Sequence, residues 1–128
     1  MSTALELSPQ ELQGYIEGLR WRLPEPTPPA EVVREREALL RRVRRAAALL
    51  HSRFKVRRVV LFGSLAHASW FRPDSDVDLA VEGIPAGDYW EAWRKVERTI
   101  RDRPVDLVDL ETASESLRRS IARYGIEL

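Results

Sequence analysis

The chain has 128 residues, of which 44% are hydrophobic and 32% charged, and its formal net charge is +1. This length predicts one domain with at most a small appendage, and this composition excludes a wholly disordered chain. The balanced charge gives no general support for nucleic-acid binding, and the absence of cysteine excludes disulfides and thiolate metal sites.

The first predicted element is an N-terminal helix that ends in a proline-rich linker. Ser8 is placed to cap this helix and Pro9 suits its first turn. The run from Pro24 to Pro29 is typical of an extended, stiff linker. We therefore assign residues 1–29 to a helical arm with its linker and residues 30–128 to the main domain.

The main domain is predicted to alternate helices with strands. Hydrophobic periodicity and turn residues place helices near 29–51, 88–100 and 112–124, strands near 55–62, 76–82 and 105–110, and a short helix after residue 64. Trp90 and Trp93 are expected in the core, and Asp88 and Thr112 at helix N-caps. The basic cluster Arg41–Arg45 is expected on a solvated helix face. This order predicts an α/β or α+β layered fold.

Two aspartates on the second strand form the first candidate site. Asp76 and Asp78 are two residues apart, so their side chains leave the same face of a strand. Adjacent carboxylates repel each other unless a cation lies between them, and hard oxygen ligands suit Mg²⁺. For an isolated pair, a solvated edge strand is the alternative interpretation.

A Gly-Ser pair follows the first strand. Glycine allows a ligand to approach the backbone at Gly63, and the hydroxyl of Ser64 is a donor for phosphate. By itself the pair is equally typical of a serine N-cap after a turn. Combined with the two aspartates, it predicts a phosphate-binding turn that faces a metal site.

These segments carry a family resemblance. Leu61-Phe62-Gly63-Ser64-Leu65-Ala66, followed by Ser75-Asp76-Val77-Asp78-Leu79, resembles the minimal nucleotidyltransferases of the polymerase-β superfamily. The later Val105-Asp106-Leu107-Val108 matches the place of that family's third aspartate. The resemblance covers roughly residues 30–128. Two features depart from the pattern: eleven residues separate Ser64 from Asp76 where ten are usual, and His67-Ala68 replaces Arg-Gly.

The resemblance implies a polymerase-β-like fold, with a small mixed sheet flanked by helices and an extra N-terminal helix. It implies Mg²⁺-dependent transfer of a nucleoside monophosphate, AMP from ATP, to a hydroxyl acceptor by a two-metal mechanism. Asp76 and Asp78 would hold the ion on the triphosphate, and with Asp106 the ion that activates the acceptor. Gly63, Ser64 and Arg72 would bind the nucleotide; the alternative for Arg72 is a surface pairing with Asp74.

Other assignments remain open at this point. Asp109 has the opposite parity to Asp106, so we expect it at a cap or on the surface, and we expect His67 to face solvent. The resemblance implies a tyrosine of a HEPN toxin as the acceptor, in an antitoxin role. The alternatives are a partner-binding antitoxin with little catalysis and a catalytic subunit that acts on a small molecule or RNA. Whether the chain forms a homo-oligomer is undecided.

The N-terminus and the hydropathy bear on location. Met1 to Ala4 lack the basic region and the apolar run of a signal peptide, and no segment is apolar for long enough to span a bilayer. We therefore expect a cytoplasmic protein without membrane contact, for which nucleic acid is not the expected partner.

Overall fold

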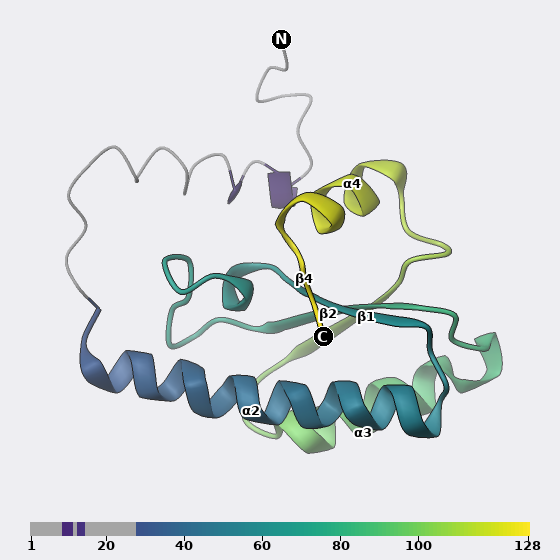
Figure 1. The fold of residues 1–128 in the computed structure, drawn as a ribbon, viewed down its shortest axis with the longest axis horizontal. Coiled ribbons are helices and arrows are strands. Elements are labelled where there is room, and N and C mark those ends of the chain that lie inside the picture. Colours follow the sequence, from purple (N-terminus) through teal and green to yellow (C-terminus); the bar gives the residue numbers. More distant parts are fainter. Residues whose placement is uncertain (1–8, 12, 15–27) are drawn as a thin grey trace, which may run out of the picture.

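The computed structural model describes residues 9–11, 13–14 and 28–128 (Figure 1). Residues 9–11 and 13–14 are helical, and the rest of the predicted arm and linker, up to residue 27, lies outside the described residues. From residue 30 the elements are α2 (Ala30–Arg53), β1 (Arg58–Phe62), the 3₁₀ turn η2 (Ser64–Ala66), β2 (Val77–Glu82), the 3₁₀ turn η3 (Ala86–Asp88), α3 (Tyr89–Ile100), β3 (Val105–Asp109), α4 (Glu115–Tyr124) and β4 (Ile126–Glu127).

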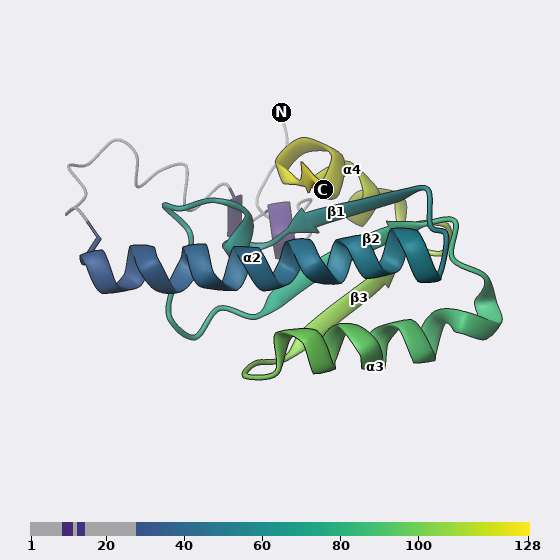
Figure 2. The ribbon, with the colours of Figure 1, turned by 60° about the horizontal axis from the view of Figure 1, so that its bottom comes forward.

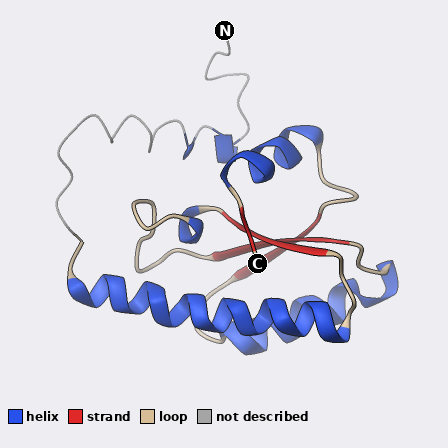
Figure 3. Ribbon diagram, in the orientation of Figure 1, coloured by secondary structure: helices blue, strands red, loops and turns tan. Residues whose placement is uncertain are grey.

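The strands form one mixed sheet in the order β3-β2-β1-β4 (Figure 3). β1 runs antiparallel to both β2 and β4, whereas β2 and β3 are parallel. A parallel pair needs a crossover, and α3 provides it. The mixed α+β architecture confirms the predicted fold class. The two-residue strand β4 was not predicted, because a segment this short has no periodicity.

Helices cover both faces of the sheet. α2 and α3 lie side by side on one face (Figure 2), and α4 lies on the other (Figure 1). Alternate residues of each strand point to opposite faces of the sheet. Leu61 packs into the larger core with α2 and α3, whereas Phe62 packs into a smaller core with Ile121 of α4. Ala80 belongs to the smaller core, so Asp78, two residues earlier on β2, points to the α4 side as well.

Aromatic residues of α3 cover the edge strand β3. The hydroxyl of Tyr89 donates to the carbonyl of Leu107, and Nε1 of Trp93 donates to the carbonyl of Val105 at 2.9 Å. These bonds occupy carbonyl groups of an edge strand, where free backbone groups would invite pairing with another chain. Trp90 was expected in the core, but this expectation is wrong: its side chain is 66% exposed and stacks on the outer side of Trp93.

Trp90 is outside the core because the buried face of α3 is narrow. It consists of the residues Ala92, Val96 and Ile100. Trp93 lies at the margin of this face and reaches the β3 edge, so Trp90, three residues earlier, lies beyond that margin. In the part of the chain that the structure describes, no helix is both long and apolar enough to cross a membrane.

The N-caps differ from those predicted. Asp88 precedes α3 but makes no side-chain capping bond. α4 is capped by Ser114, whose Oγ accepts the N–H of Leu117 at 3.1 Å. The hydroxyl of Thr112, which was expected to cap this helix, donates instead to the carbonyl of Asp109. Ser114 and Thr112 are both residue types favoured at N-caps, and they lie only two positions apart.

Replacing Ser114 with alanine should therefore lower the free energy of unfolding by about 1 kcal/mol, because the N–H of Leu117 loses its acceptor. Thr112→Ala should cost less than about 0.5 kcal/mol, since its bond is exposed. Urea unfolding followed by circular dichroism measures both. A larger loss for Thr112→Ala would contradict this cap assignment.

Candidate functional site

Strand pairing brings the three predicted aspartates to one end of the sheet. Asp78 lies opposite Asp106 in the parallel register of β2 and β3, so both side chains leave the same face. Asp76 directly precedes β2 and has the same parity as Asp78. All three carboxylates therefore belong to the α4 side of the sheet, where β1 ends and both β2 and β3 begin.

The electrostatics of Asp78 reflect this clustering. Burial raises its pKa to about 6, and the negative charges of Asp106 and Asp76 contribute further in the same direction. A carboxyl group in this environment is costly to ionise at neutral pH without a neighbouring cation. Asp76 and Asp106 are exposed, so Asp78 is the inner member of the cluster.

The donor set suits a hard divalent cation, because it consists of carboxylate oxygens. Within the described residues, no three His, Cys, Asp or Glu side chains stand close enough to hold an ion in their present rotamers. The backbone of Asp78 and Asp106 is fixed by the sheet, whereas the exposed Asp76 and Asp106 side chains have room to rotate. The residues thus fit Mg²⁺ in chemistry and in strand placement.

Gly63 lies directly beside Asp78. Its φ of +76° favours glycine strongly. A Cβ at this position would overlap Oδ2 of Asp78 and lie 3.1 Å from its Cγ. The glycine therefore has two functions: it allows the sharp turn from β1 into η2, and it leaves room for the inner carboxylate.

Ser64 and Arg72 occupy the loop between β1 and β2. Ser64 is half-buried and opens η2, which is a single 3₁₀ turn and so has little helix dipole. Arg72 is exposed, and its guanidinium donates to the carbonyls of Ser69 and Phe71, at 3.4 and 3.1 Å. The Asp74 pairing considered for Arg72 is not among these bonds, and the phosphate contact stays a prediction.

His67 does not face solvent as expected. Its Nε2 donates to the carbonyl of Tyr124 at 2.7 Å, and its ring centroid lies 4.2 Å from that of Trp70. His67 therefore fastens the loop after η2 to the end of α4. Tertiary contacts of this kind have no signature in the local sequence.

Asp109 lies apart from the three aspartates in the way strand parity predicts. Its Oδ1 accepts the N–H of Glu111 at 3.0 Å, which closes the turn after β3. Two residues that contact the candidate loop, Arg36 and Arg103, were not predicted from the sequence. Arg36 donates to the carbonyl of Leu65, and Arg103 donates to that of Ser75. Among 21 Lys and Arg residues, nothing in the sequence distinguishes these two.

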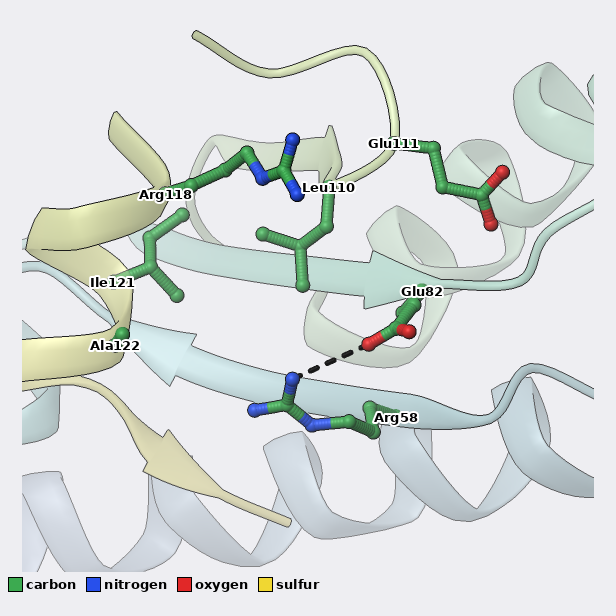
Figure 4. A pocket seen from close by; sticks show the side chains of 7 residues that line it. All are labelled: Arg58, Glu82, Leu110, Glu111, Arg118, Ile121 and Ala122. Carbon is green, nitrogen blue, oxygen red and sulfur yellow. Dashed lines mark hydrogen bonds and ion pairs between the residues drawn. The ribbon is translucent and has the colours of Figure 1, made fainter. Parts of the chain in front are cut away.

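A separate cavity of about 360 Å³ lies between α4 and the sheet (Figure 4). None of the predicted site residues lines it; its walls are Arg58, Glu82, Leu110, Glu111, Arg118, Ile121 and Ala122. Arg58 pairs with Glu82 at 3.2 Å and with Glu127 at 2.9 Å, so its charge is satisfied within the protein. Arg58 and Glu82 lie at the opposite ends of β1 and β2 from the aspartates, which makes this cavity distinct from the candidate site.

Comparisons with known proteins agree with the geometry. Residues 45–128 match the family model for polymerase beta, nucleotidyltransferase. The chain is 31% identical to a structure described as a candidate minimal nucleotidyltransferase, with a TM-score of 0.61, over 73% of this chain and 95% of the other. No protein with curated function is similar enough to count as a match.

Two further similar structures are toxin–antitoxin complexes. A mutant of the MntA–HepT complex contains a chain 30% identical to this one, with a TM-score of 0.57, over 67% of this chain and 70% of the other. A toxin–antitoxin structure with AMP-PNP matches at 28% identity and a TM-score of 0.54, over 68% and 69% of the two chains.

Proposed function

The chain belongs to the polymerase-β nucleotidyltransferase family, and we propose that it transfers AMP from ATP to a protein hydroxyl in a Mg²⁺-dependent reaction. The observation that carries this proposal is the clustering of Asp76, Asp78 and Asp106 on one face, next to the glycine turn at Gly63. A phosphoryl-transfer site needs this combination, because charge must be neutralised on several phosphate oxygens while the reactants are held in line.

Each part of the site has a distinct task in this reaction. The turn at Gly63 and Ser64 receives the phosphate oxygens of ATP. The acceptor hydroxyl approaches on the β3 side, where Asp106 is exposed and an oxygen of its carboxylate takes the hydroxyl proton. A bond then forms between the acceptor oxygen and the α-phosphorus. The bond from that phosphorus to the bridging oxygen breaks, and pyrophosphate leaves.

Mg²⁺ would be held by Asp76 and Asp78 on the triphosphate and by all three aspartates on the acceptor side, and it would supply charge neutralisation and a more acidic acceptor hydroxyl. Asp78 is the central ligand in our proposal, because it is half-buried between the turn at Gly63 and the other two carboxylates, and a cation would offset the burial and repulsion that raise its pKa. Arg72 can add a further positive charge only if its guanidinium leaves the carbonyls of Ser69 and Phe71.

We further propose that the acceptor is a tyrosine of a HEPN-domain toxin, so that the chain acts as an antitoxin in the cytoplasm. Support comes from the relatives: two of the similar structures are toxin–antitoxin complexes, and one of these contains AMP-PNP. The site itself supports a macromolecular acceptor. Asp106 lies on the edge strand β3 with its side chain exposed on the α4 side, whereas α3 covers the backbone edge of this strand.

Incubation with labelled ATP, Mg²⁺ and a HEPN toxin encoded beside this chain should label the toxin on tyrosine. Asp76→Ala should abolish the label, and Asp74→Ala, an exposed neighbour outside the cluster, should leave it unchanged. Mass spectrometry of the toxin identifies the modified residue. Labelling that survives Asp76→Ala would contradict the proposed site.

A binding antitoxin without catalysis is the second candidate. One observation favours it: the loop between Ser64 and Asp76 has eleven residues where the family pattern has ten. In that case the toxin would form a stable complex with this chain, would lose its activity in the complex, and would carry no label. Labelling of RNA or of a small hydroxyl compound in place of the toxin would instead indicate a catalytic subunit.

A further inference from the structure

We propose that the N-terminal half of α2 positions both ends of the catalytic loop: Arg36 fixes the phosphate-binding turn, and Glu35, acting through Arg103, fixes the segment before Asp76. By catalytic loop we mean residues 63–76. The inference rests on the function proposed above, because it assigns these residues to the geometry of that reaction. None of the three residues contacts the substrate in this assignment, so they are positioning residues.

Arg36 makes a two-pronged contact with the turn. Its Nε and Nη2 both donate to the carbonyl of Leu65, at 3.2 and 3.0 Å. The Leu65 side chain is fully buried beneath this carbonyl. Arg36 is half-buried, and burial of the guanidinium, with a smaller effect of Arg44, lowers the pKa of Arg36. Because Leu65 is the middle residue of η2, this contact sets the orientation of Ser64 beside it.

Arg103 makes the corresponding contact at the other end of the loop. Its Nη1 donates to the carbonyl of Ser75 at 3.0 Å and to that of Pro73 at 3.3 Å. Its Nη2 lies 3.3 Å from Oε1 of Glu35, and its Nε bonds to Asp102. The Arg103 side chain is only 9% exposed, although its partners Glu35 and Asp102 are 40% and 49% exposed.

Arg103 lies close in the sequence to one aspartate of the cluster and contacts the segment that leads to another. Ser75 directly precedes Asp76, and Arg103 stands three residues before Asp106. One guanidinium therefore joins the two segments that carry the outer carboxylates of the cluster. Glu35 and Arg36 are consecutive on α2, so a single helix sets the distance between the phosphate-binding turn and these carboxylates. In-line phosphoryl transfer is sensitive to displacements of about 1 Å, which makes this spacing functional.

The test compares Arg36→Met and Arg103→Met with Arg58→Met as the matched control. Arg58 also forms ion pairs, with Glu127 at 2.9 Å and Glu82 at 3.2 Å, but it lies at the end of β1 away from the aspartates and makes none of the loop contacts described here. For AMP transfer to the toxin, Arg36→Met should raise KM for ATP about tenfold with a smaller change in kcat. Arg103→Met should lower kcat about tenfold or more and raise the Mg²⁺ concentration at half-maximal rate. Arg58→Met should change neither KM nor kcat.

Two further measurements do not depend on turnover. Exchange of the hydrogen-bonded backbone amides should accelerate at least tenfold at Ala66 for Arg36→Met and at Ser75 and Val77 for Arg103→Met, each in its own segment. Binding of Mn²⁺ with AMP-PNP, followed by electron paramagnetic resonance, should weaken in Arg103→Met. Arg36→Lys and Arg103→Lys should recover part of each effect, because a lysine ammonium can donate to one carbonyl but cannot form the paired hydrogen bonds of a guanidinium.

The outcomes separate the two proposals. Equal effects of all three methionine variants, or exchange that accelerates over the whole chain, would overturn the positioning assignment. If the wild-type protein transfers no AMP, the proposed function fails, and the segment-specific exchange still decides whether Arg36 and Arg103 hold the two ends of the loop.

Discussion

The Asp78→Asn variant is expected to lose AMP transfer by a factor on the order of 10³ and yet to unfold less readily than the wild-type protein at pH 7. The loss of activity follows because Asp78 is the inner carboxylate of the cluster, and one ligand to a catalytic cation is worth several kcal/mol in the transition state. The gain in stability follows from the cost of burying that charge. Asn has the same shape, so no cavity forms.

The direction of the stability change follows from the pKa of Asp78. The pKa of Asp78 is about 6 in the folded protein, against an ordinary value of 3.8, so the folded state binds more protons than the unfolded state between these values. Stability should therefore fall as pH rises from about 4 to 6, and the full cost, about 1 to 3 kcal/mol, applies above pH 6. Asp78→Asn should remove this slope. Urea unfolding between pH 4 and 8 measures it.

Asp74→Asn is the matched control for this experiment. Asp74 is exposed and lies just before β2, outside the carboxylate cluster, so its replacement should alter neither activity nor the pH slope. Addition of Mg²⁺ and AMP-PNP should raise the stability of the wild-type protein more than that of Asp78→Asn. If Asp78→Asn is less stable than the wild type at pH 7, the carboxylate makes favourable contacts that outweigh its burial.

Much of the site could be predicted because strand parity is a local property. A two-residue spacing places Asp76 and Asp78 on one face, whatever the remainder of the fold. The relation of Asp106 to Asp78 came only with the family resemblance, since register between strands depends on tertiary structure. The raised pKa of Asp78 could not be predicted from the sequence either, because it depends on burial by segments distant in the sequence.

Two of the errors have a common physical cause. Trp90 and His67 were assigned from local pattern, and in each case a contact across the fold decides the outcome, whereas the cap at Thr112 was lost to a residue close by in the sequence. A serine two residues after Thr112 caps α4 in its place. Trp93, and not Trp90, bonds to the edge strand β3, and His67 bonds to the end of α4. Arg36 and Arg103 were missed for the same reason, since their partners lie 29 and 28 residues away.

The second large effect is expected for Gly63→Ala, which should lower the free energy of unfolding by about 1 to 3 kcal/mol and AMP transfer by a factor on the order of 10². Two causes act together. The backbone conformation at φ +76° strains any residue with a Cβ, and the new methyl group would overlap Oδ2 of Asp78. Gly87→Ala is the control, because a Cβ there meets nothing within 4 Å.

The two causes can be separated in the Asp78→Ala background, which removes the carboxylate but keeps the strand. If the overlap contributes, Gly63→Ala should cost at least about 0.5 kcal/mol less there than in the wild type, measured by urea unfolding. An equal cost in both backgrounds would assign the glycine to the turn alone. A smaller cost of Gly63→Ala in the Asp78→Ala background would show that the two residues are energetically coupled. Such coupling is expected in the proposed site, because the backbone at Gly63 that receives the phosphate lies against the carboxylate that binds the metal ion.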